Sequence, residues 1–272
     1  MSIRFESLSF RYSVGESTAL QDVTVEIEPG AVTLVTGRSG AGSSTLLLVA
    51  AGLAPRITGG NRQGTVTTLG YDPDSKEGHS TLAGRVGLLL STPWTQLSGM
   101  SFTVREEVAF GPANLGWKRD RIADAVNKAM VLMQVESLAL RDPRTLSGGE
   151  LQRVMLAGVA AMDPEVLLLD EPTIELDPAG ARLVYDLLPE LARDRTVVIA
   201  STDVDRAVEV ADRVLLLDRG RLVADGDAGA VLGTESAASM GCGTTVSGIM
   251  RAAGVEPAYP ITVDAAMRHL GR

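Results

Sequence analysis

Two stretches of the sequence decide the fold: LSGGELQR at residues 146–153 and VLLLDEPT at residues 166–173. In the second, four apolar residues end in two acids, the pattern of a buried strand that delivers carboxylates to the edge of a parallel sheet. Asp170 is placed there to hold Mg²⁺, directly or through water, and Glu171 to polarise an attacking water. A pair of acids that only solvates a loop is the alternative, and the serine-glycine stretch just upstream argues against it.

A third stretch, GRSGAGSST at residues 37–45, has the glycine spacing of the phosphate-binding motif G-x-x-x-x-G-K-[ST]. It follows an apolar run at 32–36, a predicted buried strand, and precedes an apolar run of helical length at 45–53. Such glycines let backbone N–H groups converge on phosphates at the positive N-terminus of the next helix. The candidate nucleotide-binding residues of this loop are Gly37, Gly40, Gly42, Ser43, Ser44 and Thr45.

The loop departs from the motif at one position, where Ser43 stands in place of the lysine. The loss removes a charge-assisted contact to the β- and γ-phosphates worth about 1.5–3 kcal/mol, roughly 10- to 100-fold in affinity. Stabilisation of the transition state should suffer more than binding. Ser44 keeps the hydroxyl that would ligate Mg²⁺. Taken alone, this loop is equally consistent with an ordinary strand–turn–helix.

Patterns elsewhere in the chain predict an α/β architecture. The first 30 residues alternate apolar and polar side chains in two short runs, which predicts an antiparallel hairpin or meander. The second half alternates predicted strands and helices, which indicates a mostly parallel sheet covered by helices. The predicted elements are strands at 3–10, 23–27, 32–36, 64–69, 86–90, 166–170, 196–201 and 214–218, and helices at 45–53, 104–110, 120–134, 179–192, 204–211, 245–253 and 263–270.

Composition narrows the class of protein. Of 272 residues, 45% are hydrophobic and 22% are charged, which excludes wholesale disorder. The formal charge of −9 argues against nucleic acid as a partner. A single cysteine allows no internal disulfide, and residues 1–20 do not resemble a signal peptide, so we expect a cytoplasmic location.

These motifs together resemble the ATP-binding subunits of ATP-binding cassette (ABC) transporters, over roughly residues 3–226. The resemblance implies a P-loop NTPase of ABC type, with a mixed core sheet, an antiparallel β subdomain, a helical subdomain at about 92–160 and a C-terminal extension at 227–272. It implies ATP and Mg²⁺ as cofactors. Tyr12 matches the aromatic residue that stacks on adenine, and a strand-edge tyrosine is the alternative. Asp177 matches the loop that crosses the dimer interface. The residues that match the family signature, which caps ATP held in the opposing subunit, are Ser147, Gly148, Gly149 and Glu150.

Within this family, AGLAP at 51–55 and EEVAFGPANLG at 106–116 look most like the energy-coupling-factor and cobalt-type importers. That resemblance implies a transmembrane coupling subunit, a substrate-binding membrane protein and a second ATPase. It places the chain peripherally on the cytoplasmic face of the membrane, with vitamins or transition-metal ions as the usual cargoes. A groove near the apolar residues Trp94, Leu97, Met100 and Phe102 would receive the membrane subunit; packing inside the domain is the alternative for each.

Three positions depart from the family pattern. Ser43 replaces the lysine, Ser91 falls where a glutamine contacts Mg²⁺ and the attacking water, and Thr202 falls where the switch histidine stands. Gln96 matches a separate family glutamine. The two histidines of the chain, His79 and His269, lie far from residue 202 in the sequence.

In the family, the lysine, glutamine and histidine act on nucleotide bound to the same subunit, whereas the signature acts on the partner's nucleotide. The pattern therefore predicts an asymmetric heterodimer: this chain binds ATP with little turnover and completes a competent site on a partner with an intact lysine and histidine. An alternative is a scaffold that binds nucleotide and a membrane partner without supporting hydrolysis. A chromosome-maintenance ATPase would need a long coiled-coil insertion between residues 91 and 147, and translation factors normally carry two cassettes.

Overall fold

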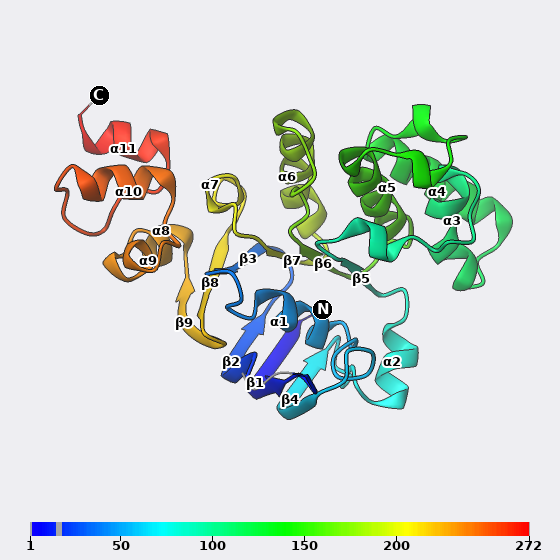
Figure 1. The fold of residues 1–272 in the computed structure, drawn as a ribbon, viewed down its shortest axis with the longest axis horizontal. Coiled ribbons are helices and arrows are strands. Elements are labelled where there is room, and N and C mark those ends of the chain that lie inside the picture. The colour runs from blue at the N-terminus through cyan, green and yellow to red at the C-terminus, as the bar shows by residue number, and fades with distance from the viewer. Residues whose placement is uncertain (1, 15–17, 272) are drawn as a thin grey trace.

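A six-stranded mixed sheet forms the centre of the protein in the computed structural model, which describes residues 2–14 and 18–271 (Figure 1). The strand order is β5-β6-β7-β3-β8-β9, and only β9 runs antiparallel to its neighbour. The strands are β3 (Val32–Gly37), β5 (Val86–Leu89), β6 (Val166–Asp170), β7 (Thr196–Ala200), β8 (Arg213–Asp218) and β9 (Arg221–Gly226). The predicted mixed core sheet is confirmed.

Alternate residues of the central strands enter two different hydrophobic cores. In β6, Leu167 and Leu169 belong to one core and Val166 and Leu168 to the other. All five residues of β6 are buried, as are all five of β7. A strand covered on both faces must be apolar throughout, so these runs are continuous and do not alternate.

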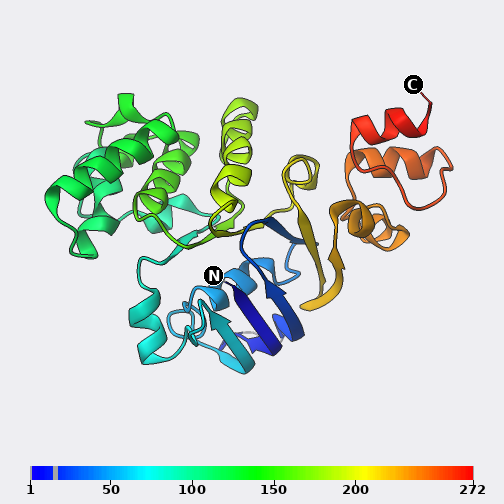
Figure 2. The same cartoon turned by 180° about the vertical axis from the view of Figure 1, so that it is seen from behind.

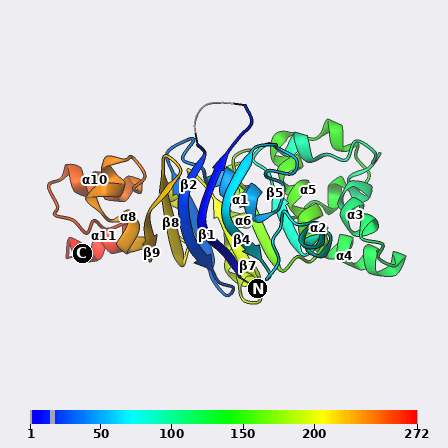
Figure 3. The same cartoon turned by 90° about the horizontal axis from the view of Figure 1, so that it is seen from below.

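A second sheet is antiparallel, in the order β2-β1-β4. Its strands are β1 (Ile3–Arg11), β2 (Leu20–Ile27) and β4 (Asn61–Thr68), which confirms the antiparallel pairing predicted for the first 30 residues. The apolar face of this sheet and α1 (Ser43–Ala50) share one core with the central sheet. Figure 3 shows β1, β2 and β4 between two groups of helices.

One group of helices covers the opposite face of the central sheet and extends beyond its β5 edge (Figure 2). It comprises α3 (Val104–Asn114), α4 (Arg119–Leu132), α5 (Gly148–Ala161) and α6 (Pro178–Ala192), with short 3₁₀ turns at Pro93–Gln96, Glu136–Leu138 and Pro143–Thr145. The boundaries proposed for a helical subdomain at 92 and 160 stay a prediction.

The other group lies at the β9 edge and is built from the C-terminal residues (Figure 1). It comprises α8 (Ala228–Leu232), α9 (Glu235–Ser239), α10 (Thr245–Ala252) and α11 (Val263–His269). Ala228, Val231 and Leu232 join the main core, so the first turn of this extension packs as part of the domain. Among the residues that the structure describes, no helix combines the length and apolarity needed to cross a membrane.

Several of the predicted helix and strand boundaries were wrong. The helix predicted at 204–211 is α7 (Val204–Ala207), because Asp212 must bond to β3: its backbone N–H donates to Val32 O at 3.0 Å, and its Oδ2 accepts from Val32 N at 2.8 Å. Four elements of the structure were not predicted from the sequence: β9, α8, α9 and the helix α2 (Lys76–Leu82).

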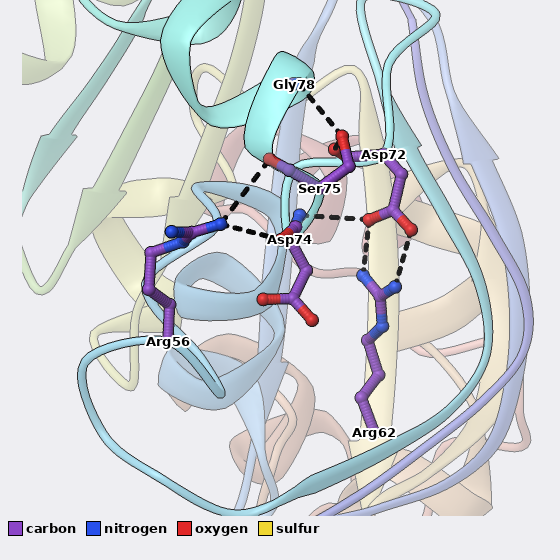
Figure 4. A network of polar contacts seen from close by, with 6 residues as sticks. All are labelled: Arg56, Arg62, Asp72, Asp74, Ser75 and Gly78. Carbon is purple, nitrogen blue, oxygen red and sulfur yellow. Dashed lines mark hydrogen bonds and ion pairs between the residues drawn. The ribbon is translucent and has the colours of Figure 1, made fainter.

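The segment that carries α2 is tied to β4 by the polar network of Figure 4. Arg62 donates from Nη1 and Nη2 to the two carboxylate oxygens of Asp72, at 2.8 and 2.7 Å. Asp72 Oδ1 also accepts from Asp74 N at 2.9 Å, and Arg56 donates to Asp74 O at 2.7 Å. The hydrogen bond and charge of Arg62 hold the pKa of Asp72 below its usual range.

We expect Asp72→Asn to lower the free energy of unfolding by about 1–2 kcal/mol, since it weakens a charge-assisted pair that is partly open to solvent. Because the pKa of Asp72 is lowered by folding, its contribution is complete above the unfolded pKa near 4 and is lost as pH falls through the folded value. Urea unfolding at pH 7 and again below pH 4 measures both effects. Asp74→Asn is the matched control, because Asp74 enters the network through its backbone; an equal loss in both variants would contradict the assignment.

Candidate nucleotide-binding site

A pocket of about 870 Å³ opens at the carboxyl ends of β3, β6 and β7. These strands are parallel neighbours, so their ends bring together segments that lie far apart in the sequence. The predicted site residues that line it are Tyr12, Gly37, Gly40, Gly42, Ser43, Ser44, Thr45, Ser91, Asp170, Glu171 and Thr202. Within the described residues, the cationic side chains on the pocket wall are Arg38 and Arg219, with no lysine or histidine.

The loop at 37–42 passes directly from β3 into α1, as the motif predicts. Gly42 has φ of 109°, and a Cβ there would lie 2.6 Å from Ala19 O, so both the conformation and the space require glycine. A Cβ on Gly37 would collide with Leu217 O of the neighbouring strand. Ser43 begins α1, two residues earlier than predicted, which puts the helix N-terminus at the pocket.

Two serines approach the carboxylate of Asp170 at the end of β6. Ser44 Oγ donates to Asp170 Oδ1 at 2.9 Å, and Ser91 lies on the same pocket wall. Burial raises the pKa of Asp170, which is only 5% exposed, and the polar groups of Ser44 and Ser91 offset part of that rise. A serine hydroxyl beside a carboxylate forms a hard oxygen donor set that fits Mg²⁺. Ser44 and Asp170 are therefore the residues that would hold it.

The carboxylate of Glu171 is held by the segment that follows β7. Thr202 donates to Glu171 Oε1 twice, from its backbone N at 2.8 Å and from Oγ1 at 2.9 Å. Ser201 Oγ donates to Oε2 at 3.0 Å. Glu171 has φ of 46°, which is uncommon for a non-glycine residue. The sequence marked Thr202 only as a missing histidine; its contact with Glu171, and the part of Ser201, came from the structure.

Gln96 and the two histidines supply no substitute groups. Gln96 accepts from Leu90 N at 2.7 Å and donates to Leu88 O at 3.0 Å, so its amide is used at the end of β5. His79 lies on α2 and His269 on α11, both exposed and neither on the described pocket wall.

Tyr12 lies on the pocket wall, and two contacts hold its side chain in place. Its hydroxyl hydrogen-bonds Thr45 Oγ1 at 3.0 Å, and its ring meets Phe10 edge-on, with centroids 4.9 Å apart. Both contacts restrict rotation of the ring on the pocket wall. Stacking of Tyr12 on adenine stays a prediction.

The signature residues are outside this pocket, at the N-terminus of α5. Ser147 and Glu150 form a capping box: Glu150 N donates to Ser147 Oγ at 3.3 Å, and Ser147 N donates to Glu150 Oε2 at 2.8 Å. Ser147 donates to the Glu150 carboxylate from N at 2.8 Å and from Oγ at 3.0 Å; these two hydrogen bonds lower the pKa of Glu150, and Arg141, at 2.8 Å, lowers it further. The carboxylate thus stays ionised at neutral pH and fixes the first turn.

The signature also contacts the segment before α6. A Cβ on Gly149 would lie 3.0 Å from Glu175 O, and one on Gly148 would meet the Glu175 side chain. Asp177 caps α6 by accepting from Gly180 N at 2.8 Å. The signature and the segment of Asp177 therefore form one surface, separate from the pocket that holds Asp170 and Glu171.

This fold and pocket define a P-loop nucleotide-binding protein of the cassette type. Residues 20–174 match the family model described as "ABC transporter", and the chain belongs to that family. Members of this family hydrolyse ATP, typically with Mg²⁺.

Known proteins of the family resemble most of the chain. A putative ABC transporter ATP-binding protein of Methanosarcina mazei is 40% identical over 82% of this chain and 38% of its own length. An energy-coupling factor transporter ATP-binding protein EcfA2 of Methanospirillum hungatei is 38% identical, over 82% and 55%. The structure of cbiO1 from Clostridium perfringens, part of the ABC transporter complex cbiONQ, has a TM-score of 0.73 at 31% identity and covers 87% of this chain and 92% of its own. The chain spans about half or less of the length of several curated relatives, 36–55% for four of them.

Proposed function

We propose that this chain is the ATP-binding subunit of a membrane importer of the energy-coupling-factor type. In this proposal its own pocket binds ATP weakly or without turnover, and Ser147–Glu150 complete the competent site of a partner ATPase that keeps the lysine and the histidine. Vitamins or transition-metal ions are the proposed cargo. The names of the EcfA2 and cbiO1 relatives support the importer class.

The observation that carries the proposal is the set of three hydrogen bonds on the Glu171 carboxylate. Donors from Ser201 and Thr202 fill three of the roughly four acceptor positions of its two oxygens, which leaves little room for a water that Glu171 would polarise. With Ser43 in the loop, the developing charge on a transferred phosphate also lacks its usual lysine. Binding therefore remains possible in this pocket while turnover is disfavoured.

Mg²⁺ bound with the nucleotide would neutralise phosphate charge. For that role Ser44 and Asp170 must present their oxygens together, and their 2.9 Å hydrogen bond shows that they lie within reach of a common ion. Because burial raises the pKa of Asp170, the ionised form that a cation needs is lost at a higher pH than for an ordinary aspartate.

The surface near residues 94–102 supports a membrane partner. Met100 and Phe102 are 75% and 77% exposed, and Trp94 is 45% exposed. Leu97 instead packs against the main core, so it belongs to the domain interior. Three exposed large apolar side chains within nine residues of sequence form a patch that fits an apolar helix of a coupling subunit.

Purified alone, the chain should bind ATP and show negligible hydrolysis, and activity should arise when it is combined with the proposed partner ATPase. A phosphate-release assay on each subunit and on the mixture measures this. The scaffold alternative, with which the three hydrogen bonds on Glu171 are also consistent, predicts no hydrolysis in any combination. Substantial turnover by the chain alone would contradict the proposal.

A further inference from the structure

Arg38 belongs to the phosphate-binding loop, yet its guanidinium is bound by the C-terminal extension. Nε donates to Met240 O at 2.7 Å and Nη2 donates to Ser239 O at 3.3 Å. Both carbonyls lie at the carboxyl end of α9, where backbone oxygens carry partial negative charge. The extension therefore touches the nucleotide pocket of its own chain through a side chain that also lines that pocket.

A second contact ties the extension to the other side of the pocket. Asp205, on α7, follows Thr202 by three residues, and its carboxylate accepts from the backbone N and from Oγ1 of Thr245. Thr245 is the first residue of α10. The extension thus has two polar anchors, Arg38 in the loop before α1 and Asp205 just after the segment that holds Glu171, in addition to the apolar packing of Ala237 and Cys242 in the main core.

Nucleotide phosphates and the extension compete for one edge of the Arg38 guanidinium. Nε and Nη2 form one of the two edges through which a guanidinium binds phosphate in a bidentate manner. Binding to phosphate adds the attraction between two full opposite charges to these hydrogen bonds, which a neutral backbone carbonyl does not supply. Since Ser43 has replaced the lysine, Arg38 is one of two cationic side chains on the described pocket wall, beside Arg219.

We propose that Arg38 is a latch between nucleotide and the C-terminal extension. The phosphates of bound nucleotide draw the guanidinium away from Ser239 O and Met240 O, and the extension then loosens while Asp205 still holds α10. By linkage, docking of the extension weakens nucleotide binding by the same factor. The inference rests on the proposed nucleotide binding in this pocket and assigns Arg38 as its phosphate-binding cation.

Hydrogen exchange on the full chain tests the latch directly. We expect saturating Mg-ATP to speed amide exchange at residues 235–243, around α9. In Arg38→Met the same amides should exchange fast without nucleotide and should not respond to it, and ATP affinity should fall about 10- to 100-fold. Arg38→Lys keeps a cation and should restore part of the affinity. ATP binding without any change in exchange, or a response in Arg38→Met equal to that of the unchanged protein, would overturn the latch.

Variants of the second anchor, the contact between Asp205 and Thr245, distinguish the latch from a contact that only supports the phosphate-binding loop. Asp205→Asn combined with Thr245→Val weakens docking without altering the pocket wall. The latch predicts ATP binding about fivefold tighter, since competition for Arg38 falls; a brace that supports the loop predicts weaker binding, and that result would overturn the proposal. Asp264→Asn, on α11, removes an acid from the extension without touching either anchor and should leave affinity and exchange unchanged.

The outcomes also separate this inference from the proposed function. If the chain binds no nucleotide, the latch is wrong. Whether Ser147–Glu150 complete the site of a partner ATPase is tested separately, by ATP hydrolysis in the complex. If the complex hydrolyses ATP independently of Ser147, the proposed function is wrong, whereas the exchange response of α9 can still be measured. Thermal unfolding of each variant checks that the fold is kept.

Discussion

In the complex with its partner ATPase, Ser147→Arg in this chain should reduce ATP hydrolysis by at least about 100-fold, the usual cost of losing a donor that stabilises transition-state charge. Ser147 is exposed at the start of α5, so its side chain and the adjoining N–H groups are available to a nucleotide held elsewhere. Loss of the cap costs about 1 kcal/mol, which is too little to unfold the domain. Steady-state phosphate release, with circular dichroism as the check on folding, measures the effect.

A second variant in the signature tests whether the loss of hydrolysis is limited to substitution of Ser147. Gly149→Asp places a carboxylate where a Cβ already lies 3.0 Å from Glu175 O, so we expect a similar loss of hydrolysis. The matched control is Glu171→Gln in this chain, which should change the rate of the complex by less than about twofold, as expected for a group not used in the transition state. If Glu171→Gln silences the complex as fully as Ser147→Arg, the asymmetric arrangement is wrong.

Ser43→Lys should tighten ATP binding to the isolated chain by about 10- to 100-fold, because it restores a charge-assisted contact to the phosphates. Hydrolysis in this chain's own pocket should nevertheless stay absent. Ser91 would still stand in place of the glutamine, and Thr202 and Ser201 would still donate to the Glu171 carboxylate. Titration with a fluorescent ATP analogue measures binding, and a complex whose partner loop is disabled isolates turnover at this site.

Turnover should return only when the three positions change together, as Ser43→Lys, Ser91→Gln and Thr202→His. The last change removes the hydroxyl that donates to Glu171 Oε1 at 2.9 Å and supplies an imidazole at the same strand end. The matched comparison is each pairwise combination, since groups that act as a unit are strongly non-additive. Measurable hydrolysis from Ser43→Lys alone would contradict the role assigned to Ser91 and Thr202.

The sequence by itself predicted the elements and motifs whose signals are local. The continuous apolar run of β6 ends at Asp170 as expected, because a strand buried on both faces leaves few alternatives. The glycines at 37–42 predicted the loop between β3 and α1, since only glycine accepts the conformation at Gly42. The capping box of Ser147 and Glu150 was found only in the structure, although its partners are three residues apart and its signal is local.

Only the tertiary structure decided which residues the side chains of the pocket contact. The bonds from Thr202 to Glu171 join two strand ends, and those from Arg38 to Ser239 and Met240 join segments about 200 residues apart. No local pattern encodes such pairs, because they depend on how parallel strands align and on where the C-terminal helices dock. The same sequence therefore predicted which groups the pocket lacks, while the fold determined that Glu171 is held by the residue in place of the histidine, and that the extension binds a cation of the pocket.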